Sequence, residues 1–411
     1  MNQQLRQDAE RIARKAIEAV CPDEAVARAL ENVTLTGRIY LIAVGKAGWQ
    51  MAHAALKHLN KPITRGIVVT KYGHVTAPLP GIDCYEAGHP VPDENSYRAT
   101  EAVLAMTEHL TAEDTVLFLL SGGGSALFEK PLVAPDVLQE LTRTMLASGA
   151  DITQINALRK RLSAVKGGRF ALWCAPARVE AVILSDVLGD PVDMIASGPA
   201  AADPVTAEEA QAIAAKYGVD SDPHIRELLA QETPKDVPNV HTQIIGSVRE
   251  LCRAAAQEAQ QLGYEPIYLT DRLNCEARDA GRWLSQELRR YAGQGKRVAL
   301  LAGGETVVHV TGTGLGGRTQ ELALASAELL SGVTGAALIS VGSDGTDGPT
   351  DAAGGYADGD SLSELKKAGV DYHASLNNND AYHALKAIGN LIITGPTGTN
   401  VNDIAIGLVD R

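Results

Sequence analysis

The sequence predicts an α/β protein with a mostly parallel sheet and a second, smaller α/β domain. Short apolar runs of strand length alternate with segments of helical spacing along most of the 411 residues, which is the pattern of βαβ units. Glycines gather directly after several of these runs, at the edge where such sheets bind ligands. The chain also exceeds one typical domain, since domains usually hold about 100–200 residues.

The first part of the chain begins with an amphipathic helix and continues with strand-like runs. Apolar residues recur at helical spacing between Leu5 and Val20, which predicts the helix. Strands are expected at 38–44, 65–70, 115–120 and 179–187. Further helices are expected over 49–59 and 96–110. The polar segment 203–240 contains several prolines and predicts a linker near residue 235, which is a candidate hinge.

A second α/β series follows this linker. Strands are expected at 242–247, 264–270, 297–303, 305–312, 336–342 and 390–395. The runs 297–303 and 305–312 are interpreted as adjacent strands, and a helix is expected over about 318–331. Nothing repeats at a fixed period, so the chain is not an array of structural repeats.

The composition is that of a globular protein with a large core, at 45% hydrophobic and 21% charged residues. The net charge of −13 argues against a nucleic-acid partner. Five cysteines without a CxxC pattern indicate a reducing compartment, with neither a disulfide framework nor a zinc site. The N-terminus lacks the apolar core of a signal peptide, and no run approaches the ~18 apolar residues of a membrane span. We therefore expect a soluble cytoplasmic protein without a membrane partner.

The segment FLLSGGGSAL (118–127) joins a strand-like run to three consecutive glycines. Gly122, Gly123 and Gly124 allow the backbone N–H groups to approach an anion, and a following helix N-terminus would favour negative charge. Ser121 and Ser125 are better interpreted as ligands than as nucleophiles, because Leu127 breaks the GxSxG pattern. The alternative is a tight turn at the strand end.

GKAG (45–48) has the same position after an earlier strand-like run. Lys46 follows Gly45 just before a helix, where the helix dipole does not favour a cation. A lysine at this position indicates an anionic partner. The alternative is an ordinary surface lysine.

TGTGLGGRTQE (311–321) contains a G-x-G-x-x-G pattern before a predicted helix. Gly314, Gly316 and Gly317 are candidate phosphate-binding residues. A dinucleotide site would need an acidic residue about 20 positions on, and Asp344 follows somewhat late. Arg318 opens the helix with a guanidinium suited to phosphate or carboxylate, unless it only forms a surface salt bridge.

Acidic residues occupy three loops, LSDVLGDPVD (184–193), GGET (303–306) and SDGTDGPTD (343–351). Carboxylates are ligands that Mg²⁺ uses when it also binds phosphates, although Asp and Gly also favour turns. The candidates are Asp186, Asp190, Glu305, Asp344 and Asp347. In TGPTGTNVND (394–403), Asn400 could bind a polar ligand or form a turn. Motifs of P-loop NTPases, protein kinases and zinc proteases are absent.

Anion loops, two cations and loop carboxylates together make the set that phosphoryl transfer needs. The motifs that carry a family resemblance are VGKAG (44–48), AGHPVPDENS (87–96), LLSGGGSAL (119–127), INALRKRLSAVKGGRFA (155–171), LSDVLGD to IASGP (184–199), LAGGETVVHVTGTGLGGRTQELALA (301–325), SDGTDGPTDAAGG (343–355) and TGPTGTNVNDI (394–404). With these motifs in this order, the chain resembles the MOFRL-type glycerate 2-kinases, whose bacterial members are often labelled hydroxypyruvate reductase.

The resemblance implies ATP-dependent phosphorylation of D-glycerate at its 2-hydroxyl with Mg²⁺. It implies a Rossmann-like domain over 1–237, a MOFRL-type α/β domain over 238–411, and an active site in the cleft between them. Lys46 and Arg318 match the family's cleft-lining cations, whereas Thr319 stands where the family pattern has Asn. A homodimer is one oligomeric state that the sequence allows.

The expected roles follow from this resemblance and the loop chemistry. Lys46 and Arg318 would bind the substrate carboxylate and the γ-phosphoryl group, and Asp186 or Asp190 would orient or deprotonate the 2-hydroxyl or bind Mg²⁺. Glu305, Asp344 and Asp347 are the other candidate metal ligands. One competing interpretation is an NAD(P)H-dependent hydroxypyruvate reductase, which the GTGLGG loop would favour. The other is a non-catalytic sensor of a phosphorylated metabolite, which the acidic loops argue against.

Overall fold

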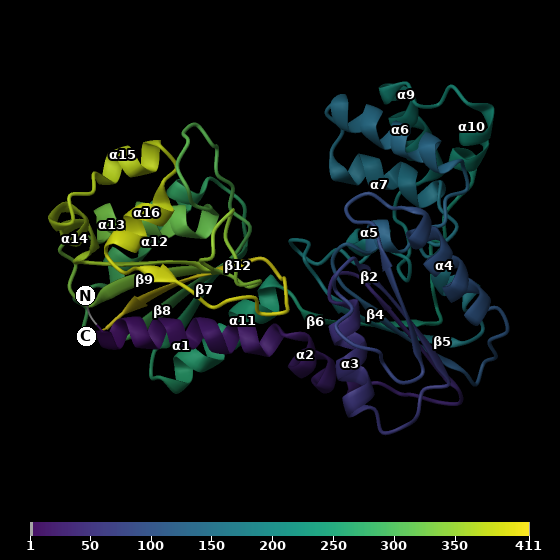
Figure 1. Cartoon of the computed structure of the whole chain (residues 1–411), viewed down its shortest axis with the longest axis horizontal. Helices are drawn as coiled ribbons and strands as arrows, with labels where there is room; N and C mark the ends of the chain where they lie inside the picture. The colour runs from purple at the N-terminus through teal and green to yellow at the C-terminus, as the bar shows by residue number, and fades with distance from the viewer. Residues whose placement is uncertain (1–2, 411) are drawn as a thin grey trace. The chain divides into compact units, whose positions relative to one another are not determined.

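The computed structural model describes residues 3–410, which fold into two compact units. One unit is residues 25–245, and the other combines the N-terminal residues up to 24 with residues from 246 onward. Each unit contains a six-stranded sheet covered by helices (Figure 1). The predicted α/β fold class, with a parallel sheet and a second α/β unit, is therefore confirmed. No described helix is long and apolar enough to cross a membrane.

The sheet of unit 25–245 has the order β3-β2-β1-β4-β5-β6. Its strands are β1 (Ile39–Val44), β2 (Arg65–Lys71), β3 (Ile82–Ala87), β4 (Thr115–Leu120), β5 (Arg178–Leu184) and β6 (Val240–Gly246). The pairs β3–β2, β2–β1, β1–β4 and β4–β5 are parallel. This is the strand order of a doubly wound Rossmann sheet, in which ligands bind where the order reverses. Here that point lies between β1 and β4.

Both faces of this sheet are buried, which explains the continuous apolar runs. Along β4, Phe118 packs into the hydrophobic cluster on one face, and Leu117 and Leu119 pack into the cluster on the other. The helices of the unit are α2 (Pro22–Leu30), α3 (Gly48–His58), α4 (Glu94–Met106), α5 (Gly124–Leu127), α6 (Pro135–Ala147), α7 (Ile152–Arg161), α8 (Arg169–Trp173), η1 (Ile195–Ser197), α9 (Ala207–Tyr217) and α10 (Pro223–Ala230). Helices α6, α7, α9 and α10 share a core of their own and group together next to α5 (Figure 1).

The sheet of the other unit is mixed, with the order β11-β10-β9-β12-β8-β7. Its strands are β7 (Glu265–Leu273), β8 (Val298–Gly304), β9 (Ala336–Gly342), β10 (Gly354–Asp358), β11 (Leu391–Ile392) and β12 (Asp403–Val409). Strand β12 runs antiparallel between β8 and β9, so its first residue, Asp403, lies opposite their last residues, Gly304 and Gly342. The ends of three strands therefore meet at one edge.

Helices cover this second sheet on both faces, and one of them comes from the N-terminus. They are α1 (Gln3–Val20), α11 (Val248–Gln261), α12 (Ala277–Tyr291), α13 (Arg318–Leu330), α14 (Ser361–Lys367), α15 (Tyr372–Asn377) and α16 (Ala381–Ala387). Helix α1 lies beside α11 against the sheet (Figure 1). Its buried Asp8 accepts a hydrogen bond from the Tyr264 hydroxyl at 2.8 Å and pairs with Arg297 at 3.2 Å.

The predicted division at residue 237 differs from the compact units at both ends of the first domain. Helix α1 packs with the second unit, and β6 joins the first sheet beside β5. The chain therefore passes between the units at 24–25 and again at 245–246. The predicted linker near 235 lies inside unit 25–245, where Thr233 donates to the buried Asp203 at 2.7 Å.

One strand prediction in the second unit was wrong, and another was too long. Residues 305–312 form a loop that carries one isolated bridge, and Val310 is 71% exposed, although the apolar pattern favoured a strand. The predicted strand 390–395 is reduced to the two residues of β11. The last strand, β12, was missed because it follows a loop rich in Gly, Thr and Asn and its own run is interrupted by Gly407.

Candidate active site

The candidate site of unit 25–245 lies at the carboxyl ends of β1 and β4, where the strand order reverses. Gly45 has φ of 121°, and a Cβ there would collide with Ser121. The Ser121 hydroxyl donates to the carbonyl of Val44 at 3.3 Å and accepts from the N–H of Ala47 at 3.1 Å. The Ser121 hydroxyl thus links the end of β1 and the loop after it to the loop after β4, and backbone groups already occupy it.

Three loops press against the three consecutive glycines that follow Ser121. A Cβ at Gly122 would collide with the Asp186 carboxylate, and a Cβ at Gly124 would lie 2.6 Å from the Cβ of Ala196. Gly123 has φ of 88°, in the left-handed region that favours glycine. Helix α5, which follows, has only four residues. The predicted anion loop therefore depends on its own N–H groups and neighbouring cations rather than on a long helix dipole.

Basic side chains lie at the carboxyl ends of β1, β2 and β3 or just after them, on one side of this loop. They are Lys46, Lys71, His74 and His89. A His74 ring nitrogen bonds the Lys46 carbonyl at 2.9 Å. Within residues 3–410, the Lys46 ammonium has no hydrogen bond or ion pair. A partly buried cation of this kind is available to an anionic ligand.

The connection after β5 carries Asp186 and Asp190, and the Asp186 carboxylate lies against Gly122. Strand β5 lies on the side of β4 away from β1. Asp190 has φ of 54°, and Ala196 and Ser197 have φ of 51° and 62°. Left-handed non-glycine residues cost about 1–3 kcal/mol each and cluster at functional sites. The edge of the sheet therefore has cations at one end, glycines in the middle and carboxylates at the other end.

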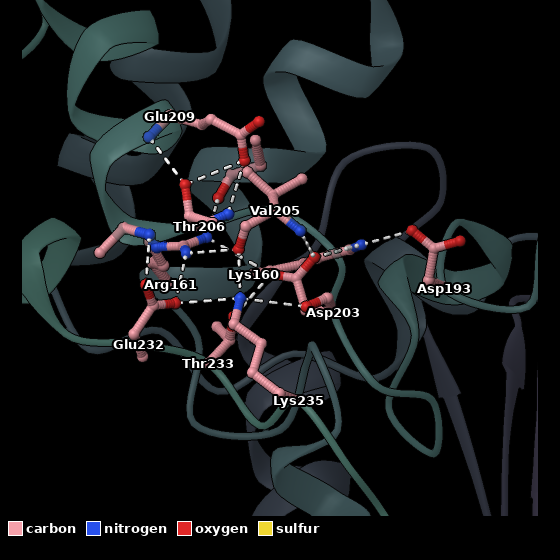
Figure 2. Close-up of polar contacts among 12 residues, drawn as sticks. Lys160, Arg161, Asp193, Asp203, Val205, Thr206, Glu209, Glu232, Thr233 and Lys235 are labelled. Carbon is pink, nitrogen blue, oxygen red and sulfur yellow. Dashed lines mark hydrogen bonds and ion pairs between the residues drawn. The ribbon is translucent and has the colours of Figure 1, made fainter.

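A buried ion-pair network holds this acidic segment (Figure 2). The Lys160 ammonium, on α7, bonds Asp193 at 2.9 Å and Asp203 at 3.1 Å. Asp203 also accepts from Arg161 at 3.3 Å and from Thr233 at 2.7 Å. Because Lys160, Arg161 and Asp203 are fully buried, losing one partner would leave an uncompensated charge. The network therefore positions the segment that follows β5.

A second buried network holds the end of the glycine loop. The carbonyl of Ser125 accepts from Lys166 at 2.9 Å and from Arg159 at 3.1 Å, and the Ser125 hydroxyl bonds that of Ser197 at 3.0 Å. Glu129 lies 3.5 Å from the Lys166 ammonium. Burial lowers the pKa of Lys166 to about 8. The motif INALRKRLSAVKGGRFA (155–171) thus contains cations that support this loop, a role that the sequence did not reveal.

In the unit that contains β7–β12, Arg318 opens α13 and meets two carboxylates. Its Nε and Nη2 bond Asp403 at 2.6 and 3.1 Å, and its Nη1 bonds Glu305 at 2.8 Å. Burial raises the pKa of Asp403 to about 7, while Arg318 opposes that rise. Sequence reasoning missed Asp403, although TGPTGTNVND ends on it.

The other two acidic candidates of this edge have different environments. Asp347 is buried and accepts from the N–H groups of Thr319 and Gln320 at 3.3 and 2.9 Å, so it caps α13. Thr319 is buried, and its hydroxyl donates to the carbonyl of Ala353 at 3.1 Å. Asp344 is partly exposed, and one of its oxygens accepts from Thr346 at 3.0 Å.

The glycines of GTGLGG pack against the connection between α15 and α16. The N–H of Gly314 donates to the carbonyl of Asn378 at 2.8 Å, and the N–H of Leu315 donates to Asp380 at 3.1 Å. A Cβ at Gly316 would lie 3.3 Å from the backbone of Ala381, and one at Gly317 would collide with the Asp347 carboxylate. Close packing within the protein therefore explains the glycines of this motif, and no bound dinucleotide is needed to explain them. Asn400 is exposed, and its side-chain oxygen accepts from the N–H of Asn402 at 3.4 Å.

A magnesium ion would find few protein ligands here. Among residues 3–410, no group of three or more His, Cys, Asp or Glu side chains could hold a metal ion. Asp347 is occupied by helix capping, whereas Glu305 and Asp344 each keep an oxygen that could bind one. One or two carboxylates suit Mg²⁺ that takes its other ligands from phosphates and water.

A Rossmann sheet with cations, glycines and carboxylates at its switch point defines a ligand-binding α/β protein of the kind that handles anions. Two family descriptions match this chain: a domain of unknown function, DUF4147, over residues 8–230, and MOFRL over residues 298–403. The D-glycerate 2-kinase of Thermotoga maritima is 52% identical over 404 residues, which cover 97% of each chain. The chain belongs to the MOFRL-type glycerate 2-kinase family, which confirms the predicted resemblance.

Two further comparisons support this placement. The crystal structure of a glycerate kinase from Thermotoga maritima superposes with a TM-score of 0.96 at 51% identity, covering 99% of this chain and 100% of that one. A protein from Agrobacterium vitis that is named as a hydroxypyruvate reductase is 40% identical over 424 residues, which cover 98% of this chain and 94% of its own. Both names that the resemblance implied therefore occur among the relatives.

Proposed function

We propose that this chain is a glycerate 2-kinase, which transfers the γ-phosphoryl group of ATP to the 2-hydroxyl of D-glycerate. The observation that carries the proposal is that two charged side chains border the loop Gly122–Gly124: Lys46, whose ammonium has no partner within residues 3–410, borders Gly123, and the Asp186 carboxylate borders Gly122. Its Thermotoga maritima relative is named for this activity and matches almost the whole chain. Phosphoryl transfer depends mainly on positioning and on charge stabilisation, which these groups supply.

In this mechanism, Lys46 and the N–H groups of the glycine loop bind anionic oxygens of the two substrates. Asp186 or Asp190 accepts the proton of the 2-hydroxyl as its oxygen attacks the γ-phosphorus, and the bond to the ADP oxygen breaks. When bound, Mg²⁺ neutralises phosphate charge, and Glu305 and Asp344 are the residues we propose to hold it. Asp347 is less suited to that role because it caps α13.

Arg318 can bind an anionic ligand while Asp403 still holds its guanidinium group. Its pair with Glu305 is partly exposed, and exposed ion pairs contribute only about 0–1 kcal/mol. A substrate carboxylate or phosphate can therefore replace Glu305 at Nη1, while Asp403 still holds Nε and Nη2. That this arginine and Lys46 act on one substrate in a shared cleft stays a prediction.

The alternative, an NAD(P)H-dependent hydroxypyruvate reductase, is supported by the name of the Agrobacterium vitis relative. It is disfavoured by the GTGLGG loop, whose Gly314 and Leu315 N–H groups are bonded within the protein. A dinucleotide fingerprint instead needs such a loop to approach the pyrophosphate.

The test is ³¹P NMR of the products after the purified chain is mixed with ATP, Mg²⁺ and D-glycerate. A 2-phosphoglycerate signal that grows together with ADP supports the proposal. A 3-phosphoglycerate signal would keep the kinase but change the position of glycerate. No turnover, together with NADH oxidation by hydroxypyruvate, would favour the reductase. A homodimer stays a prediction that light scattering can test.

A further inference from the structure

His89 lies next to the candidate anion loop and has no role in the mechanism so far. It follows β3, and its ring reaches the backbone of Gly123. A Cβ placed on Gly123 would lie 2.9 Å from His89 Cδ2, 3.1 Å from His89 Nε2 and 3.3 Å from Lys46 Cγ. The imidazole edge and the Lys46 side chain therefore border the same residue of the glycine loop.

No described residue bonds the ring nitrogens of His89. Over the described residues 3–410, no hydrogen bond or ion pair involves this side chain, although it is half-buried. A polar group in such a position is normally satisfied by a ligand or by water. The carboxylate of Asp93, four residues further on, is already engaged, since it caps α4 and accepts from the Tyr72 hydroxyl at 2.7 Å.

The surroundings of His89 favour the neutral form of its ring. Burial lowers its pKa first, and the charges of Lys46, Lys71 and His74 lower it further. A neutral imidazole still offers one N–H donor. It can therefore hydrogen-bond an anionic oxygen directionally, beside the full charge of Lys46, without adding a second permanent charge to the loop.

We propose that His89 is a substrate-contacting residue whose Nε2–H donates to a carboxylate or phosphoryl oxygen bound at Gly122–Gly124 next to Lys46. This inference rests on the proposed function, because it assigns His89 to the same anion. An anion at this place also offsets the nearby positive charges, so its binding raises the pKa of the His89 ring. Binding and protonation of His89 therefore favour each other.

The first test compares His89→Ala and His89→Gln in the full chain, since glutamine keeps an N–H donor. We expect His89→Ala to lower kcat/KM for D-glycerate at least tenfold and His89→Gln to recover most of that loss. His109→Ala is the matched control, because the His109 side chain is 91% exposed, and it should behave as wild type. Wild-type kcat/KM in folded His89→Ala would overturn the proposal.

The second test does not depend on turnover or on a stable variant. Long-range ¹H–¹⁵N NMR of the wild-type imidazoles follows His89 while D-glycerate, ATP or inorganic phosphate is added. We expect the His89 signals to shift and its titration to move to higher pH with at least one anion, with His109 unaffected. If the chain phosphorylates nothing but His89 still responds to phosphate, the kinase proposal fails and the anion contact stands. No response to any of the three anions refutes the contact.

Discussion

Replacing Lys46 should change the activity with little effect on the stability of the fold. Its ammonium has no partner within residues 3–410, so Lys46→Ala breaks no ion pair and leaves no buried charge unpaired. We expect kcat/KM for D-glycerate to fall by roughly 10²–10³, the usual cost of losing one group that stabilises developing charge. Lys57→Ala, in the last turn of α3, serves as the control. Retained activity in Lys46→Ala would remove this lysine from the mechanism.

Asp403 should make the stability of its unit depend on pH. Its folded pKa of about 7 lies above the ordinary value near 4, so the folded state binds more protons between these values. Its stabilising contribution is therefore complete below about pH 4 and is lost as the pH rises through 7. Asp403→Asn cannot titrate, so wild type should lose stability relative to this variant between pH 4.5 and 8.

This pH effect can be measured by urea unfolding followed through Trp283, which lies in the same unit as Asp403. Replacing Trp49 and Trp173 by Phe in both chains leaves Trp283 as the only tryptophan. The midpoint of wild type should fall relative to that of Asp403→Asn as the pH rises. Parallel midpoints at all pH values would mean that the pKa of Asp403 is not raised.

Sequence reasoning could place candidate residues that stand directly next to a clearly predicted strand or helix. It missed residues that are distant in the sequence and that the order of the strands places close together. Lys46 and Arg318 stand beside glycines at a strand end and a helix start, so their positions could be predicted. Asp403 meets Arg318 across 85 residues, because β12 inserts between β8 and β9. His89 reaches Gly123 because β3 and β4 end at the same edge of one sheet. A single sequence shows neither approach.

At the scale of elements, the loop after β4 needs its glycines because other loops fill the space around it. Gly122→Ala would place a Cβ against the Asp186 carboxylate without requiring a left-handed residue. We expect kcat to fall at least tenfold because Asp186 is displaced, while thermal unfolding changes little. Gly73→Ala is the control: it has a left-handed φ of 78° but nothing near its Cβ. It should lose some stability and keep activity.

If Gly122→Ala instead lost stability and kept its kcat, the loop after β4 would have a purely structural role. The sequence predicted that the three glycines meet an anion. It did not show that Asp186 and Ala196, from the connection after β5, and His89, from the loop after β3, approach them. The same limit applies to strands. The apolar alternation of 305–312 favoured a strand that does not form, because an isolated pattern does not show whether a partner strand is present.

At the scale of the whole molecule, the N-terminal helix belongs to the unit formed by the C-terminal part of the chain. Ile12 on α1 is fully buried, so Ile12→Ala should cost about 2–5 kcal/mol. That cost should fall on the unit that contains β9 and β12. In hydrogen exchange followed by mass spectrometry, amides of β9, β12 and α11 should lose protection, whereas those of β1 and β4 should keep it.

Arg14→Ala controls for a change on α1 that leaves the core intact, because the Arg14 side chain is 67% exposed. It should change protection in neither unit. Faster exchange in β1 and β4 of Ile12→Ala would instead place α1 with the first domain, as the predicted boundary at residue 237 did. If the loss of amide protection is confined to the unit that contains β9 and β12, helix α1 is needed to complete that unit. The fragment 246–411 alone should then be unstable and should gain protection when a peptide of residues 1–24 is added.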